Sequence, residues 1–101
     1  MNFAVDGSGL RIAATAYDPA SGRVMEISTN QAGVQFYTAN GMKNQKGKGG
    51  AVYPQHGGFC LETQAFPDAI NKEGKAGWPS IILRPGQTYR HVMVHRFSVK
   101  N

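Results

Sequence analysis

Glu62 is the residue whose type and setting are best suited to chemistry. It lies within residues 59–64, where apolar and polar residues alternate as in a half-buried strand, so its carboxylate shares a face with Cys60 and Gln64. Acidic residues are depleted within strands. A carboxylate whose pKa is raised towards neutrality by partial burial can act as a general base. A solvent-facing glutamate is the common alternative, and the alternation alone leaves both interpretations open.

Histidine and cysteine spacing argues against a metal site. His91 and His95 are four residues apart, but the alternating residues between them indicate a strand, in which they stand roughly 13 Å apart and cannot share one zinc ion. His56 and Cys60 supply only two ligands. A single cysteine is more commonly a buried structural thiol. We therefore expect no metal and interpret Cys60 as a buried thiol.

Two other functional motifs are excluded by their spacing. The loop at residues 41–49 has five residues between Gly41 and Gly47, where a phosphate-binding loop needs four, and Gly49 stands where that motif needs serine or threonine. The Gly-x-Ser-x-Gly motif of a nucleophile elbow does not occur. The sequence therefore supports neither a phosphate-binding loop nor a serine nucleophile for acyl transfer.

Size and composition indicate one small folded unit. The chain is 41% hydrophobic and 17% charged, a composition too apolar for a disordered chain. Its 101 residues are too few to build a large core. The formal charge is +5. Three of the lysines fall in one glycine-rich stretch, at positions 43, 46 and 48, which is typical of a solvated loop. Because basic and aromatic residues are not interleaved as a stacking platform requires, we expect no nucleic-acid partner.

The cysteine content and the amino-terminal residues favour a soluble, cytoplasmic chain. Cys60 is the single cysteine, so no internal disulfide can form, which suits a reducing compartment. Residues 1–7 lack the basic and apolar regions of a signal peptide, and no apolar run reaches the roughly 18 residues of a membrane helix. We expect no membrane partner.

The elements that must position these side chains are strands. Residues 10–17 and 23–29 alternate on either side of a turn sequence at residues 18–22, which contains proline and glycine. This pattern predicts a hairpin. Residues 33–39 predict a third strand, with Gln35 on the face opposite Val34 and Phe36, and residues 59–64 predict a fourth.

The remaining segments complete an all-β pattern. Residues 40–50 predict a mobile connecting loop, and residues 65–79 predict an irregular segment. Pro85 and Gly86 predict a tight turn, and residues 88–99 predict the longest strand. Because no domain boundary interrupts the pattern, residues 1–101 form a single unit, sandwich-like in architecture.

A long segment of this chain resembles a known family. Residues 51–69 (AVYPQHGGFCLETQAFPDA) closely resemble the segment that holds the catalytic base in aldose 1-epimerases. Three further blocks agree in order: residues 21–26 (SGRVME), 33–38 (GVQFYT) and 83–91 (LRPGQTYRH). The resemblance covers essentially the whole chain and identifies it with the carboxy-terminal part of the family's domain.

The resemblance implies roles for two residues. Glu62 matches the general base, which removes the anomeric hydroxyl proton as a hexose such as galactose or glucose opens and recloses to the other anomer. Gln35 matches a position that lines the sugar pocket; its alternative is a polar residue on an exposed strand face. The family uses no metal or cofactor. Its histidine acid lies upstream of the matched region, and the histidines of this chain do not match that acid.

The resemblance also implies a fold: a β-sandwich roughly three times this length, of which residues 1–101 form an incomplete carboxy-terminal part. Unpaired strand edges invite association. We therefore expect the chain alone to be either marginally stable or self-associated. Because the histidine acid lies outside the matched region, we also expect the chain alone to be inactive and an amino-terminal segment to complete the domain. The alternative function is that of a non-catalytic carbohydrate-binding or interaction module of the same fold.

Overall fold

Strands supply nearly all of the regular structure, as predicted. A computed structural model describes all residues, 1–101. The strands are β1 (Asn2–Ala4), β2 (Arg11–Tyr17), β3 (Arg23–Thr29), β4 (Gly33–Tyr37), β5 (Gln45–Lys46), β6 (Val52–Tyr53), β7 (Cys60–Gln64) and β8 (Met93–Val99). Two short 3-10 helices, η1 (Lys48–Gly50) and η2 (Ala69–Lys72), lie between strands. Neither has the length and apolar character of a membrane-crossing helix.

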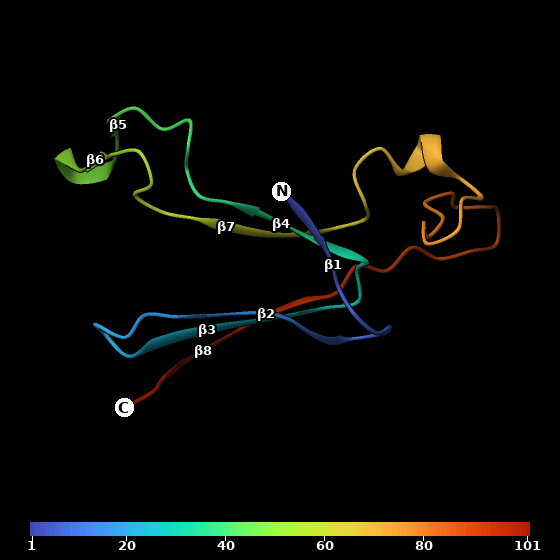
Figure 1. Cartoon of the computed structure of the whole chain (residues 1–101), viewed down its shortest axis with the longest axis horizontal. Helices are drawn as coiled ribbons and strands as arrows, with labels where there is room; N and C mark the ends of the chain where they lie inside the picture. The colour runs from blue at the N-terminus through green and yellow to red at the C-terminus, as the bar shows by residue number, and fades with distance from the viewer.

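The chain forms two antiparallel three-stranded sheets that lie one above the other (Figure 1). One sheet has the strand order β1-β4-β7, and the other has the order β2-β3-β8. Residues 30–32 connect β3 in one sheet to β4 in the other. The all-β sandwich expected from the sequence is thus confirmed, in the form of two small layers.

The hairpin of β2 and β3 is confirmed, and its turn uses the residues that the sequence pointed to. The Asp18 carboxylate accepts hydrogen bonds from the Ser21 hydroxyl at 2.7 Å and from the Ala20 amide at 3.2 Å. Gly22 has a φ of +78°, and a Cβ there would lie 2.7 Å from the carbonyl oxygen of Lys100. Glycine is required at this position both for backbone conformation and for space.

The last strand is shorter than the predicted 88–99, because its partner β3 ends before those residues are reached. The side chain of Asn30 replaces a strand there. Its amide oxygen accepts the Val92 N–H at 2.9 Å, and its NH2 donates to the Arg90 carbonyl at 2.9 Å. The Asn30 N–H donates the last backbone bond, to the Val92 carbonyl at 3.3 Å, and beyond it Arg90 is held by a side chain instead of by a continued backbone ladder. The tight turn at Pro85 and Gly86 is confirmed.

Two short pairings were not predicted. Residues 40–50 contain β5 and η1, and β5 pairs with β6 through Gln45 and Tyr53, so this segment is more ordered than the predicted loop. β1 at Asn2–Ala4 adds a third strand beside β4. Strands of two or three residues are too short to show a period of two, which explains why the sequence pattern did not reveal them.

The core is thin. Eight of 101 residues are buried. They include Ile27 of β3 and Val34 of β4, the central strands of the two sheets. Every residue of β8 is exposed. The radius of gyration is 16.8 Å, compared with about 13 Å for a compact domain of this length. The two sheets therefore form an open arrangement with much apolar surface in contact with solvent.

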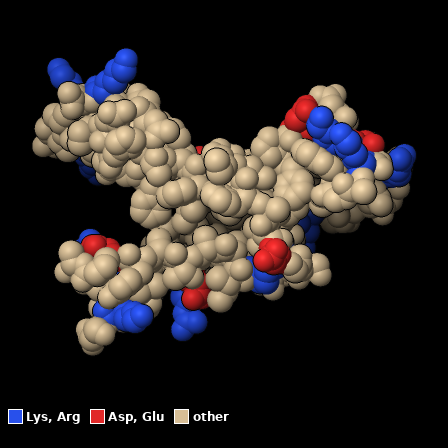
Figure 2. Space-filling model, in the orientation of Figure 1, with Lys and Arg blue, Asp and Glu red and all other residues tan.

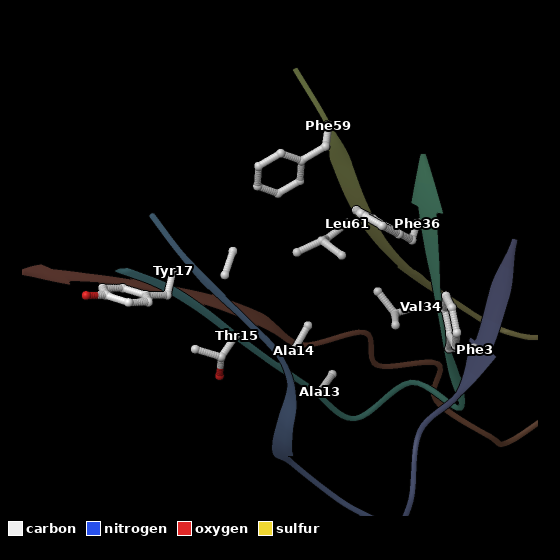
Figure 3. Close-up of a pocket in the computed structure, with 10 residues that line it drawn as sticks. Phe3, Ala13, Ala14, Thr15, Tyr17, Val34, Phe36, Phe59 and Leu61 are labelled. Atoms are coloured by element: carbon white, nitrogen blue, oxygen red, sulfur yellow. The ribbon is translucent and has the colours of Figure 1, made fainter. Parts of the chain in front are cut away.

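An apolar cavity of about 530 Å³ lies between the two sheets. Phe3, Val34, Phe36 and Leu61 point into it from the β1-β4-β7 sheet, towards β2 (Figure 3). The space-filling view shows the two layers parting at one end of the molecule, with lysine and arginine in separate groups on projecting parts of the surface (Figure 2). The side chains on the cavity side define the inner face of each sheet.

Candidate active site

Glu62 lies at the middle of β7 and points away from the cavity between the sheets. Its neighbour Leu61 lines that cavity, and because successive side chains of a strand point to opposite faces, Glu62 lies on the outer face. Cys60 and Gln64 share this face. The alternation predicted from the sequence for residues 59–64 is therefore found in the structure, with β7 beginning one residue later than predicted.

Three polar residues form a row across the outer face. Gln35 lies directly opposite Glu62 in the β4-β7 pair, and Asn2 lies directly opposite Gln35 in the β1-β4 pair. Directly opposite residues have Cβ atoms about 4.5–5.5 Å apart. Gln35 and Glu62, the two residues singled out from the sequence, are thus immediate neighbours across two strands.

The amide of Gln64 joins this row. Its Nε2 donates one hydrogen bond to Oδ1 of Asn2 at 3.0 Å and another to Oε1 of Gln35 at 3.3 Å. All three side chains are partly buried. The alternation in residues 59–64 placed Gln64 on the face of Glu62 without indicating a role for it. Asn2 was not expected at the site, because β1 was not predicted.

The Glu62 carboxylate is exposed and takes part in none of the chain's side-chain hydrogen bonds or ion pairs. The single ion pair of the molecule joins Lys72 and Asp68, in and next to η2. The carboxylate is therefore free to accept a proton from a ligand on the outer face. The partial burial that suits a general base is not provided by residues 1–101 alone.

The loop before β7 is attached to the end of β4 by His56 and Gln55. The His56 amide donates to the Ala39 carbonyl at 3.2 Å, and its ring Nδ1 lies 2.8 Å from the Thr38 carbonyl oxygen. Because a carbonyl can only accept, Nδ1 carries the proton. Gln55 Nε2 donates to the Asn40 carbonyl at 3.0 Å. These bonds help to hold β7, and Glu62 with it, in register beside Gln35.

The other two histidines lie on the far side of the sheet from Glu62. His91 Nε2 is 2.8 Å from Oγ1 of Thr63, whose side chain is on the inner face. His95 lies in β8 opposite the buried Ile27, and its ring stacks on Phe97 at a centroid distance of 6.3 Å. Neither ring is placed to exchange a proton with a ligand at Glu62.

No group of three or more histidine, cysteine, aspartate or glutamate side chains could hold a metal ion. The interpretation of Cys60 as a buried thiol was wrong, because it is exposed. Cys60 lies on the same outer face as Glu62, opposite Tyr37 of β4, and both Cys60 and Glu62 are exposed there.

Comparison with known proteins identifies the family. The family model of aldose 1-epimerase matches residues 1–96. The chain belongs to the aldose 1-epimerase family. It is 50% identical over 100 residues to galactose mutarotase of Homo sapiens and 48% identical to that of Bos taurus, in each case covering 97% of this chain and 28% of the relative.

A more distant relative is aldose 1-epimerase of Escherichia coli, 27% identical over 93 residues, which covers 90% of this chain and 26% of that protein. The chain thus spans little more than a quarter of the length of the curated relatives that it matches. The resemblance inferred from residues 51–69 and the three other blocks is confirmed, as is its partial extent.

Proposed function

We propose that this chain supplies the general base and one sugar contact of an aldose 1-epimerase that interconverts the α and β anomers of hexoses such as galactose and glucose. Family membership supports the reaction class. The observation that carries the assignment of residues is the direct pairing of Glu62 with Gln35 on the outer face. A free carboxylate beside an amide offers a proton acceptor and a hydrogen-bond partner for neighbouring sugar hydroxyls.

In this proposal the Glu62 carboxylate removes the proton of the anomeric hydroxyl. The C1–O5 bond breaks as an acid protonates the ring oxygen, giving the open-chain aldehyde. Rotation about C1–C2 presents the other face of the carbonyl. On reclosure O5 attacks C1 and returns its proton to the acid, while Glu62 returns its proton to the new anomeric oxygen. Each proton that is removed is replaced, so the carboxylate is regenerated, and the step requires no redox partner.

The acid in this proposal comes from outside residues 1–101. His91 and His95 lie on the inner side of the sheets, and the Nδ1 of His56 is committed to a carbonyl. We infer that an amino-terminal segment supplies the acid and covers the outer face, which would give Glu62 the partial burial that a base near neutral pH needs. The exposed strand β8 and the greater length of the relatives support such a completion.

A second candidate function is sugar binding without catalysis. It is favoured by the amide-rich outer face, where Asn2, Gln35 and Gln64 form a connected group, together with an unburied Glu62. Amide groups bind sugar hydroxyls equally well in an enzyme and in a binding module. The two functions differ in whether loss of the Glu62 charge removes turnover.

Polarimetry of α-galactose tests the proposal. The 101-residue chain is assayed alone and joined to the part of human galactose mutarotase that precedes its matched segment. We expect the joined protein to be active, the chain alone to be inactive, and Glu62→Gln to lower kcat by roughly 10²- to 10⁴-fold in the joined protein. Glu73→Gln, an equal change of charge at another exposed residue, serves as control. A joined protein that folds and binds galactose but does not turn it over would favour the binding module.

A further inference from the structure

We propose that Gln64 is a positioning residue that sets which way the amide of Gln35 faces, so that the NH2 group of Gln35 is directed to a sugar hydroxyl beside Glu62. The inference rests on the proposed function and adds a residue to that same site. It is carried by the two hydrogen bonds that a single Gln64 nitrogen donates across the outer face.

The donor and acceptor inventory of the three amides decides their orientation. The Nε2 of Gln64 has two N–H groups, and both are used: one on Oδ1 of Asn2 at 3.0 Å and one on Oε1 of Gln35 at 3.3 Å. Because each amide has one oxygen and one nitrogen, holding the oxygen of Gln35 towards Gln64 leaves its NH2 directed elsewhere. That NH2 has no partner within the chain.

Gly33 provides the space in which the three amides meet. It lies opposite Gln64 in β7 and opposite Ala4 in β1. A Cβ at this position would lie 2.5 Å from Oδ1 of Asn2 and 3.1 Å from a ring carbon of Phe66. Any other residue would therefore displace Asn2, which is the second acceptor of Gln64. The close approach of backbone and side chains is independent support for a site built around Gln64.

The resulting arrangement has a chemical direction. Glu62 is an acceptor, and an amide NH2 from the directly opposite residue is a donor. Neighbouring hydroxyls of a sugar ring match this pair, because one can donate to the carboxylate while the other accepts from the amide. If the Gln35 amide turned over, it would present its oxygen in place of its NH2, and the site would offer two acceptors to the sugar instead of one group of each kind.

The test is a mutant cycle in the joined protein described above, with kcat and KM for galactose measured separately. Gln64→Met removes both donated hydrogen bonds while keeping side-chain length. Gln64→Glu replaces the donor by an acceptor and so favours the turned-over amide. Loss of one hydrogen bond of ordinary strength corresponds to roughly 2- to 12-fold in binding. We expect a rise in KM of that size for Gln64→Met, a larger rise for Gln64→Glu, and little change in kcat or in its pH profile.

The decisive result is the double variant. If Gln64 acts through Gln35, Gln64→Met produces no further rise in KM in a Gln35→Ala background. Effects that multiply in the double variant would overturn the inference, and so would an unchanged KM in Gln35→Ala alone. Circular dichroism checks folding, and if Gln64→Met does not fold, the same cycle is run with Gln64→Glu. Failure of this inference is separable from failure of the proposed function. The proposed function fails if the joined protein has no turnover or if Glu62→Gln keeps its activity, and neither result depends on Gln64.

Discussion

Replacing Ile27 by valine measures how much of the stability of this open fold depends on its small core. Ile27 is 1% exposed at the centre of β3, whereas Ile12 in the edge strand β2 is 57% exposed. Both substitutions remove one methylene and keep a β-branched side chain, so strand propensity is held constant. The difference between them therefore reports burial alone.

The expected cost of Ile27→Val is about 0.5–1.5 kcal/mol, from the transfer of the lost methylene and the small cavity that it leaves. For a chain of this length, each kcal/mol lowers the melting temperature by about 4–8 °C, so a decrease of roughly 2–12 °C follows. Ile12→Val removes a group that is already in water, and its expected effect is within about 0.5 kcal/mol.

The assay is thermal unfolding of the 101-residue chain followed by far-ultraviolet circular dichroism, with all three proteins at the same concentration. A larger decrease in melting temperature for Ile27→Val than for Ile12→Val agrees with the structure. Equal decreases for the two variants would refute the reasoning, because they would mean that Ile27 is no better shielded than an edge residue.

Two further predictions concern association and pH. The exposed β8 strand and the open cavity between the sheets predict that the chain self-associates, so its melting temperature should rise with concentration, and sedimentation should detect species larger than a monomer. A cooperative melt of a monomer that is independent of concentration would contradict this. The hydrogen bond from the Ser21 hydroxyl, followed by that from the Ala20 amide, lowers the pKa of Asp18 below its ordinary value of 3.8. These hydrogen bonds therefore stabilise the turn fully at pH values above the ordinary pKa of 3.8. The stabilisation is lost as the pH falls through the lowered pKa. Titration of Asp18 by nuclear magnetic resonance should show the low pKa, and Ser21→Ala should raise it; an unchanged pKa in that variant would exclude the hydroxyl as the main cause.

Local sequence pattern was sufficient for the strands that carry the site. The alternation at residues 59–64 predicted which face Glu62 occupies, and the alternation at residues 33–39 did the same for Gln35. These predictions succeeded because side chains of a strand alternate between faces with a period of two, a property of the local backbone. The hairpin between β2 and β3 was predictable for a similar reason, since Asp18 and Gly22 satisfy their turn through near neighbours in sequence.

Pairings between distant segments required the tertiary structure. That Gln35 stands directly opposite Glu62, and Asn2 opposite Gln35, depends on the register of three strands from separate parts of the chain. A shift of one residue would turn every side chain to the other face without changing the sequence pattern. The exposure of Cys60 also depends on what covers its face, which no local pattern reports.

The sequence by itself determined that this chain is all-β, that it belongs with the aldose 1-epimerases, that Glu62 shares a strand face with Cys60 and Gln64, and that Gln35 lies on the face opposite Val34 and Phe36. Only the tertiary structure decided that Gln64 donates to both Asn2 and Gln35 across the sheet. The physical reason is range: strand alternation follows from neighbouring residues, whereas a hydrogen bond between residues 62 positions apart exists only once non-local pairing has set the register.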